Sequence, residues 1–178
     1  MIGYLSACFA TLLAGVFGMS AAGKLRSFSE FARTLEPLFH ISERRARLLT
    51  VALLLSEGAT VVLLAAGWIA SRNVTAAGFL MALGLLTAFE LVILMEISRG
   101  RQMRCLCFGR EEAPFGIRHV ARNAVLGVSC IAGVVSLETP AGLHPAGLVV
   151  SLLSGAVLAL IVAAMDDLIA LFHGLDNA

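Results

Sequence analysis

Two cysteines one residue apart are the part of this sequence best suited to chemistry. Cys105 and Cys107 lie in the segment "RGRQMRCLCFGREEAPFGIRHVARN" (99–123), in which arginines are frequent. The thiolate is the reactive form of cysteine, and nearby cations stabilise it and so lower the thiol pKa. We therefore expect Arg101 and Arg104 to activate this pair for thiol–disulfide exchange with a partner protein.

The spacing of the two cysteines favours exchange over a structural role. A disulfide across a single intervening residue closes a small strained ring, and strain raises the reduction potential of the bond. Such a pair is expected to oxidise a partner or to exchange readily with it. One cysteine would attack a partner disulfide and the other would resolve the mixed disulfide, in either order.

Two other interpretations of this segment stay open. The thiols and the nearby Met103 are soft sulfur ligands that suit Cu(I), so the chain could bind or transport copper. Zinc fits less well, because a closed zinc site usually has four ligands and the obvious third, His119, is far away in sequence. We assign no metal ligands. The chain could also be a non-catalytic assembly factor that holds a partner through its basic surface.

Outside this segment the sequence is mostly apolar, which indicates a membrane protein. Of its 178 residues, 59% are hydrophobic and 14% are charged, against about 25% charged in ordinary soluble domains. The apolar residues form runs at 2–23, 48–70, 74–97, 120–137 and 145–165. A helix needs about 20 such residues to cross the hydrocarbon core. We predict an all-α, polytopic membrane helix bundle, a single integral membrane domain over 1–178, with the fourth span the shortest.

The basic residues predict how the bundle is oriented. Of the 13 Lys and Arg residues, 12 flank the first and third connections between runs, and the exception is Arg72. Basic residues in short loops stay on the cytoplasmic side. We therefore expect a multi-pass protein of the cytoplasmic (inner) membrane with its N-terminus out and its C-terminus in. Cys105 and Cys107 would face the cytoplasm. We expect the protein to lie in the lipid bilayer and to bind no nucleic acid.

The first connection contains a candidate amphipathic helix. Phe28, Phe31 and Leu35 recur at helical spacing before Pro37, which is expected to stop the pattern. This predicts a short helix over about 28–36 that lies on the membrane surface. An ordinary loop with some apolar residues is the alternative.

Ionisable side chains within the spans are the second candidate site. Counted at 1.5 Å per residue from the cytoplasmic helix ends, Glu90 lies about 10 Å deep and Glu57 about 15 Å deep. Lys24, Arg122, Asn123 and Asp166 fall in the same half. An ion pair between a glutamate and Lys24 or Arg122 would offset the cost of burial. These residues could then handle protons or line a small-molecule pocket, unless Lys24 and Arg122 simply extend to the headgroups.

Cys8 and Cys130 form a possible second thiol pair. Both lie within spans, about 10 Å below the outer face. Electrons could therefore pass between the two cysteine pairs, although an isolated cysteine in a membrane helix is usually inert. Thiol exchange itself requires no cofactor. A quinone is a candidate electron acceptor, for which the sequence shows no motif.

Small residues recur every four positions in two spans, which favours close helix contacts. They are Ala10, Ala14, Gly18 and Ala22 in the first span, and Ser151, Gly155, Ala159 and Ala163 in the fifth. We expect both stripes to lie at helix interfaces.

Several short stretches of this chain match the pattern of a known family. They are Arg99–Arg101, Cys105–Gly109, Arg122–Asn123, Lys24–Leu25, Phe31 and Glu57. In these residues the chain resembles the MauE family of methylamine utilisation, which is grouped with the wider DoxX-like membrane proteins. The resemblance implies a four-helix DoxX-like core, to which the fifth span would be an addition. It also implies a redox-associated protein that works with a thioredoxin-like partner to mature a disulfide-containing client, such as the methylamine dehydrogenase small subunit.

Overall fold

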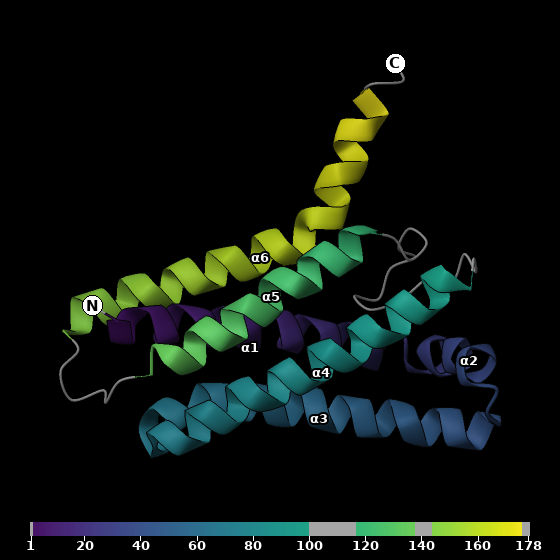
Figure 1. Cartoon of the computed structure of the whole chain (residues 1–178), viewed down its shortest axis with the longest axis horizontal. Coiled ribbons are helices and arrows are strands. Elements are labelled where there is room, and N and C mark those ends of the chain that lie inside the picture. Colours follow the sequence, from purple (N-terminus) through teal and green to yellow (C-terminus); the bar gives the residue numbers. More distant parts are fainter. Residues whose placement is uncertain (1, 100–116, 138–143, 176–178) are drawn as a thin grey trace.

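The protein is built of helices (Figure 1). The structure, a computed structural model, describes residues 2–99, 117–137 and 144–175. Its helices are α1 (Ile2–Arg26), α2 (Phe28–Phe39), α3 (Glu43–Ala70), α4 (Arg72–Ser98), α5 (Ile117–Val135) and α6 (Pro145–Leu175). The described residues contain no strand, so the prediction of an all-α bundle is confirmed.

Four of the helices are long and apolar enough to cross a membrane. These stretches are Gly3–Arg26, Glu43–Gly67, Arg72–Ser98 and Pro145–Met165. The apolar part of α5, His119–Val135, is shorter. Each of the five predicted runs therefore corresponds to a helix, and the fourth run gives the shortest apolar one, as expected.

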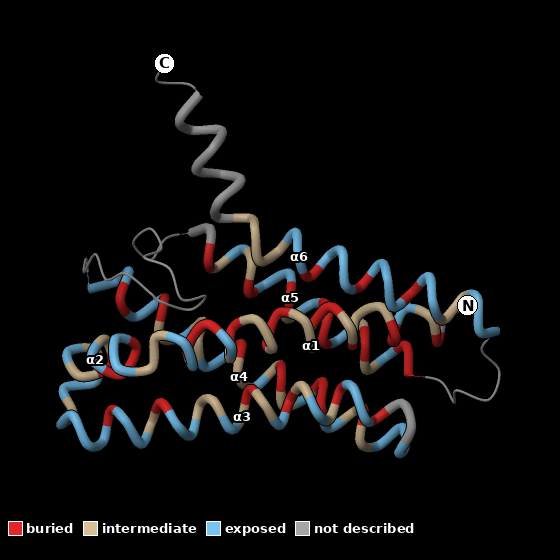
Figure 2. The backbone as a smooth tube through the Cα atoms, turned by 180° about the vertical axis from the view of Figure 1, so that it is seen from behind, coloured by how far each residue is buried: buried red, intermediate tan, exposed pale blue. Residues whose placement is uncertain are grey.

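Helix α1 lies at the centre of the bundle (Figures 1 and 2). It packs against α3 and α5, and α4 packs against both of these, so α1, α3, α4 and α5 close into a ring. Helix α6 packs on α1 from outside this ring. In the most apolar stretch of each helix, 39% of the α1 residues but only 11% of the α6 residues are buried. The predicted arrangement of a four-helix core with an added fifth span is thus confirmed.

The interior of the ring is apolar, and so is much of its outer surface. Leu13, Phe79, Leu126 and Cys130 are fully buried where α1, α4 and α5 meet. Large aliphatic side chains such as Leu55 of α3 are exposed on the outside. Such a surface would be unfavourable in water but suits hydrocarbon, where helices associate through close packing.

Close backbone approach holds α6 against α1. A Cβ atom at Gly155 would collide with the carbonyl oxygen of Cys8, and one at Gly15 would lie 2.7 Å from the Cβ of Ala159. Ser151 and Ala159 are buried in the same interface. The predicted small-residue stripe of α6 therefore makes a helix contact.

The predicted stripe of α1 behaves differently. Helix α6 meets α1 at Cys8, Thr11 and Gly15, which are offset from that stripe. Gly18 instead faces Val61 of α3, and Ala22 is exposed. The expectation that this stripe lies at helix interfaces therefore holds at Ala10, which is buried, and at Gly18, but not at Ala22. Because α1 is surrounded by several helices, the stripe is divided among them.

Helix α2 covers one end of the ring. Phe31 and Leu35 pack with Ala46 on the first turns of α3, which extend beyond the end of α1. Pro37 does not stop the helix as predicted, since α2 continues to Phe39 and ends at His40, whose φ is 51°. A proline this close to a helix end removes only one hydrogen bond. The predicted amphipathic helix is therefore present, three residues longer than expected, with its apolar face packed against protein.

Candidate functional site

A lysine and a glutamate form a buried ion pair between α1 and α3. Lys24 Nζ lies 2.6 Å from Glu57 Oε1, and the two side chains are 1% and 0% exposed. Ser20, one turn before Lys24, donates a hydrogen bond to the same oxygen at 3.2 Å and accepts one from Lys24. Lys24, one of the two cations expected as partners of Glu57, contacts it in the structure.

Two aromatic rings enclose the ammonium group of this pair. Lys24 Nζ lies 5.4 Å from the ring centroid of Phe31 and 5.5 Å from that of Phe89. Cations within about 6 Å of a ring face are attracted by the negative face of the ring. Because α2 places Phe31 over the end of α1, Lys24 is enclosed by protein. Its side chain therefore does not extend to the headgroups.

The second carboxylate oxygen of Glu57, Oε2, takes no part in the contact with Lys24. This atom is buried and accepts no hydrogen bond from the described residues. A buried carboxylate oxygen without a donor is energetically unfavourable. The position of this atom matters because Glu57 lies on the wall of a cavity.

The cavity has a volume of about 380 Å³ and lies among α1, α2, α3, α4 and α5. Most of its wall is apolar, and four phenylalanines contribute to it: Phe17, Phe31, Phe39 and Phe89. Its polar wall residues are Ser20, Lys24, Thr34, Glu57, His119, Arg122 and Asn123. The structure thus brings Lys24, Glu57, Arg122 and Asn123 to the wall of one cavity.

Two further glutamates of α4 lie outside this wall. Glu90 is half-buried, and its Oε2 atom has no hydrogen-bond partner among the described residues. The prediction that Glu90 shares the pocket with Glu57 is therefore wrong: its helix presents Phe89 to the cavity instead. Glu96 is 1% exposed and pairs with Arg99 at 3.0 Å.

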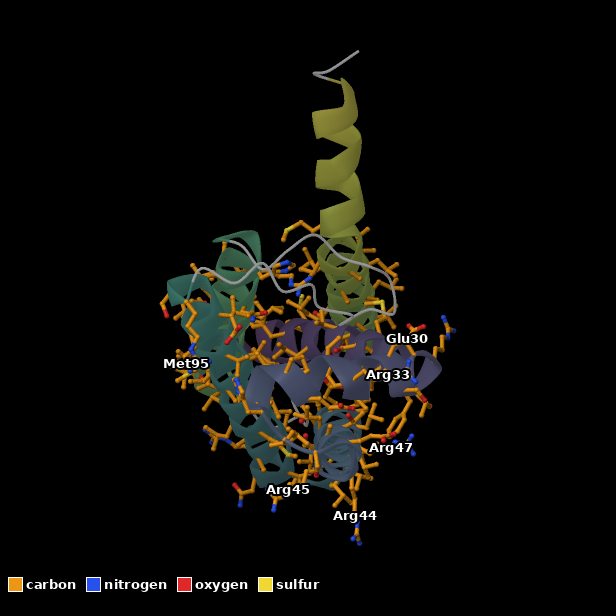
Figure 3. The ribbon with its side chains drawn as sticks, turned by 90° about the vertical axis from the view of Figure 1, so that its right-hand side faces the viewer. Glu30, Arg33, Arg44, Arg45, Arg47 and Met95 are labelled. Carbon is orange, nitrogen blue, oxygen red and sulfur yellow. The ribbon has the colours of Figure 1, made fainter. Side chains whose placement is uncertain are left out.

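Positive charge gathers at the end of the bundle that holds the cavity. Figure 3 shows Arg33 of α2 together with Arg44, Arg45 and Arg47 of α3 at this end. Arg72, at the start of α4, lies at the opposite end of α3. The described basic residues are thus divided between the two ends as the sequence predicted.

The family model described as "Methylamine utilisation protein MauE" matches residues 2–137. The chain belongs to the MauE family. Neither the curated proteins nor the solved structures that were compared give a match. With its long apolar helices, this MauE protein of methylamine utilisation is a multi-pass membrane protein.

The residues matched by the MauE family model contain most of the fold. The match covers α1–α5, and therefore the four-helix ring, the covering helix α2 and every wall residue of the cavity. Helix α6 lies beyond it. The match also runs through the Cys-x-Cys segment.

The predicted catalytic residues of this MauE protein lie outside the described residues. They are Cys105 and Cys107 with the supporting Arg101 and Arg104. The chain leaves the described structure at Arg99, after α4, and returns at the start of α5, which carries the wall residue His119. The segment is thus attached at the cavity end of the bundle.

The second candidate thiol pair lies in the described helices. Cys8 of α1 is half-buried, Cys130 of α5 is fully buried, and both are free cysteines. Helices α1 and α5 pack against each other. A redox role for this pair stays a prediction.

Sequence reasoning missed several members of the site. Ser20 is four residues before Lys24, a spacing that places both on one face of a helix and that could have revealed it. Phe89 directly precedes Glu90, but its role depends on how α4 is rotated, which the sequence does not state. His119, which the sequence offers only as a distant zinc ligand, lies on the cavity wall.

Proposed function

We propose that this MauE protein carries out thiol–disulfide exchange at the membrane through Cys105 and Cys107. It would act with a thioredoxin-like partner in the maturation of a disulfide-containing client. The observation that carries this proposal is the family match over 2–137, which includes both cysteines. The basic end of the bundle, to which their segment is attached, supports it because cations favour thiolates.

The exchange needs only the two sulfurs and their partners. The thiolate of one cysteine attacks a partner disulfide, which breaks as a mixed disulfide forms. The second thiolate then displaces the partner sulfur. Cys105 and Cys107 end as a disulfide and the partner gains two thiols, so two electrons have moved to the partner. The reverse sequence passes the disulfide to a client.

Trapping of the mixed disulfide tests the proposal. Cys105→Ser and Cys107→Ser are expressed separately in native membranes, because either cysteine can be the attacking one. We expect one of the variants to accumulate a covalent adduct with a protein partner that a reductant releases. The double variant is the matched control and should trap nothing. Absence of an adduct in both single variants, with client maturation intact in the double variant, would leave a non-catalytic assembly factor instead.

Copper handling is the other outcome to be distinguished. Stoichiometric Cu(I) binding by the reduced protein, lost in the double variant, would favour it.

The location of the cysteines raises a second question. We infer from the basic end a cytoplasmic membrane protein with its N-terminus out, although disulfides form mainly outside the cytoplasm. A relay through Cys8 and Cys130 would connect the two sides. Client oxidation should then fall in both Cys8→Ala and Cys130→Ala, and full turnover in both excludes the relay.

A further inference from the structure

The cavity beneath α2 has the size and position of a site for a lipid-soluble small molecule. Its volume of about 380 Å³ falls within the roughly 300–1,000 Å³ of small-molecule sites. It lies between helices whose outer faces carry exposed Leu and Val side chains suited to lipid. A ligand dissolved in the bilayer could therefore approach the cavity from the lipid around these helices.

The buried charges of the wall favour a neutral ligand that carries a hydrogen-bond donor. The ammonium group of Lys24 and the carboxylate of Glu57 already neutralise each other at 2.6 Å. An additional ion would gain no counter-charge from this pair and would have to be desolvated. Glu57 Oε2, in contrast, is buried and lacks a donor among the described residues, so a ligand hydroxyl would satisfy it.

The rest of the wall favours a flat ring. Phe17, Phe31, Phe39 and Phe89 reach the cavity from three helices, and aromatic rings prefer offset or edge-to-face contacts with one another. Asn123 of α5 is 8% exposed and also lies on the wall. Its side-chain amide offers both donors and an acceptor, so it suits a carbonyl as well as a hydroxyl group.

We propose that this cavity binds the headgroup of a quinone and its quinol. The quinol hydroxyl would donate to Glu57 Oε2, and the quinone carbonyl would accept from the amide of Asn123. Binding in the cavity does not depend on the proposed thiol chemistry.

A role for the bound quinone rests on the proposed function. As the Cys105–Cys107 disulfide forms, the two thiols lose two electrons and two protons. The quinone gains two electrons and two protons and becomes the quinol. Quinone would thus be the oxidant that restores the Cys105–Cys107 disulfide after each exchange in which the disulfide is passed to a client.

Photolabelling tests the binding site directly. The full-length protein in lipid nanodiscs is illuminated with a short-chain azido-ubiquinone, and labelled peptides are identified by mass spectrometry. We expect saturable labelling on the cavity-lining parts of α2 and α4, displaced by decylubiquinol. Val92→Trp fills the cavity while leaving the ion pair in place, and should lower the affinity roughly tenfold or more. Leu91→Trp, on the neighbouring exposed face, is the matched control and should label as the wild type does.

The possible outcomes separate this inference from the proposed function. Labelling that does not saturate, or that is equal in Val92→Trp and Leu91→Trp, overturns the quinone site whatever the trapping experiment gives. Saturable labelling that persists in the Cys105→Ser/Cys107→Ser variant supports the site, even if no partner is trapped. Reduction of decylubiquinone by the reduced protein should require both cysteines. Reduction of equal extent in the double variant overturns the electron transfer.

Discussion

At the scale of single residues, the site depends on charges that are held together in an apolar interior. Lys24 and Glu57 share one short contact, and Ser20 and two phenylalanine rings surround the ammonium group. Charges buried in this way stabilise a fold little relative to apolar residues, but removal of only one of them is strongly unfavourable. Burial of such a pair is therefore weak evidence for a stabilising role.

Single and double substitutions at the ion pair give a stability prediction. Glu57→Leu removes the carboxylate that neutralises Lys24, so the free energy of unfolding should fall by roughly 3–5 kcal/mol. The double variant Lys24→Met/Glu57→Leu should recover most of this loss, and Ser20→Ala should lose only about 1 kcal/mol. Unfolding in mixed detergent micelles measures the differences. Equal stability of Glu57→Leu and the wild type would contradict the prediction.

At the scale of helices, α2 controls whether the ion pair is enclosed. Its apolar face packs on the start of α3. Phe31 lies in this contact with α3 and also lies over the ammonium group of Lys24. The helix is therefore a part of the site as well as a connection between two spans.

A pair of phenylalanine variants tests this role of α2. Phe31→Leu keeps an apolar side chain but removes the ring over Lys24, and should lower stability by about 0.5–2 kcal/mol. Phe28→Leu changes a residue of the same helix that does not line the cavity, and should have a smaller effect. Thermal unfolding of the two purified variants provides the comparison. A larger loss in Phe28→Leu would show that the ring over Lys24 is unimportant.

Glycine substitutions test how α6 is held. Gly155→Ala places a methyl group against the backbone oxygen of Cys8, which cannot move aside easily. We expect a loss of about 1–3 kcal/mol from this overpacking. Gly84 of α4 has nothing within 4 Å of its Cβ position, so Gly84→Ala should be neutral or stabilising by about 0.5–1 kcal/mol. Denaturant unfolding measures both, and equal effects would refute the close contact.

At the scale of the whole molecule, the two ends of the bundle differ in charge, and this asymmetry predicts its orientation. Ser29→Cys lies in α2 at the basic end and Asn73→Cys lies in α4 at the opposite end, and both positions are exposed. In a background with the four native cysteines replaced by serine, an impermeant maleimide should label Asn73→Cys on intact cells. Ser29→Cys should react only after permeabilisation. The reverse pattern would place the basic end outside.

The sequence predicts the parts of this molecule that depend on local pattern. Long apolar runs indicate the spans, and the spacing of Phe31 and Leu35 indicates α2. The pairing of Lys24 with Glu57 depends on which helices are neighbours. The rotation of α4, which turns Phe89 rather than Glu90 to the cavity, likewise depends on tertiary packing. These features arise from contacts between helices that are distant in sequence, and local patterns do not encode them.

The short apolar stretch of α5 has a consequence for the surrounding lipid. Its 17 residues span about 26 Å at 1.5 Å per residue, whereas a hydrocarbon core is about 30 Å thick. Val125, Val128, Ile131 and Val135 on this helix are exposed, so we expect acyl chains to contact it. The expected hydrophobic mismatch would be met by local thinning of the bilayer or by an offset depth of α5, and would make the stability of the protein depend on acyl-chain length.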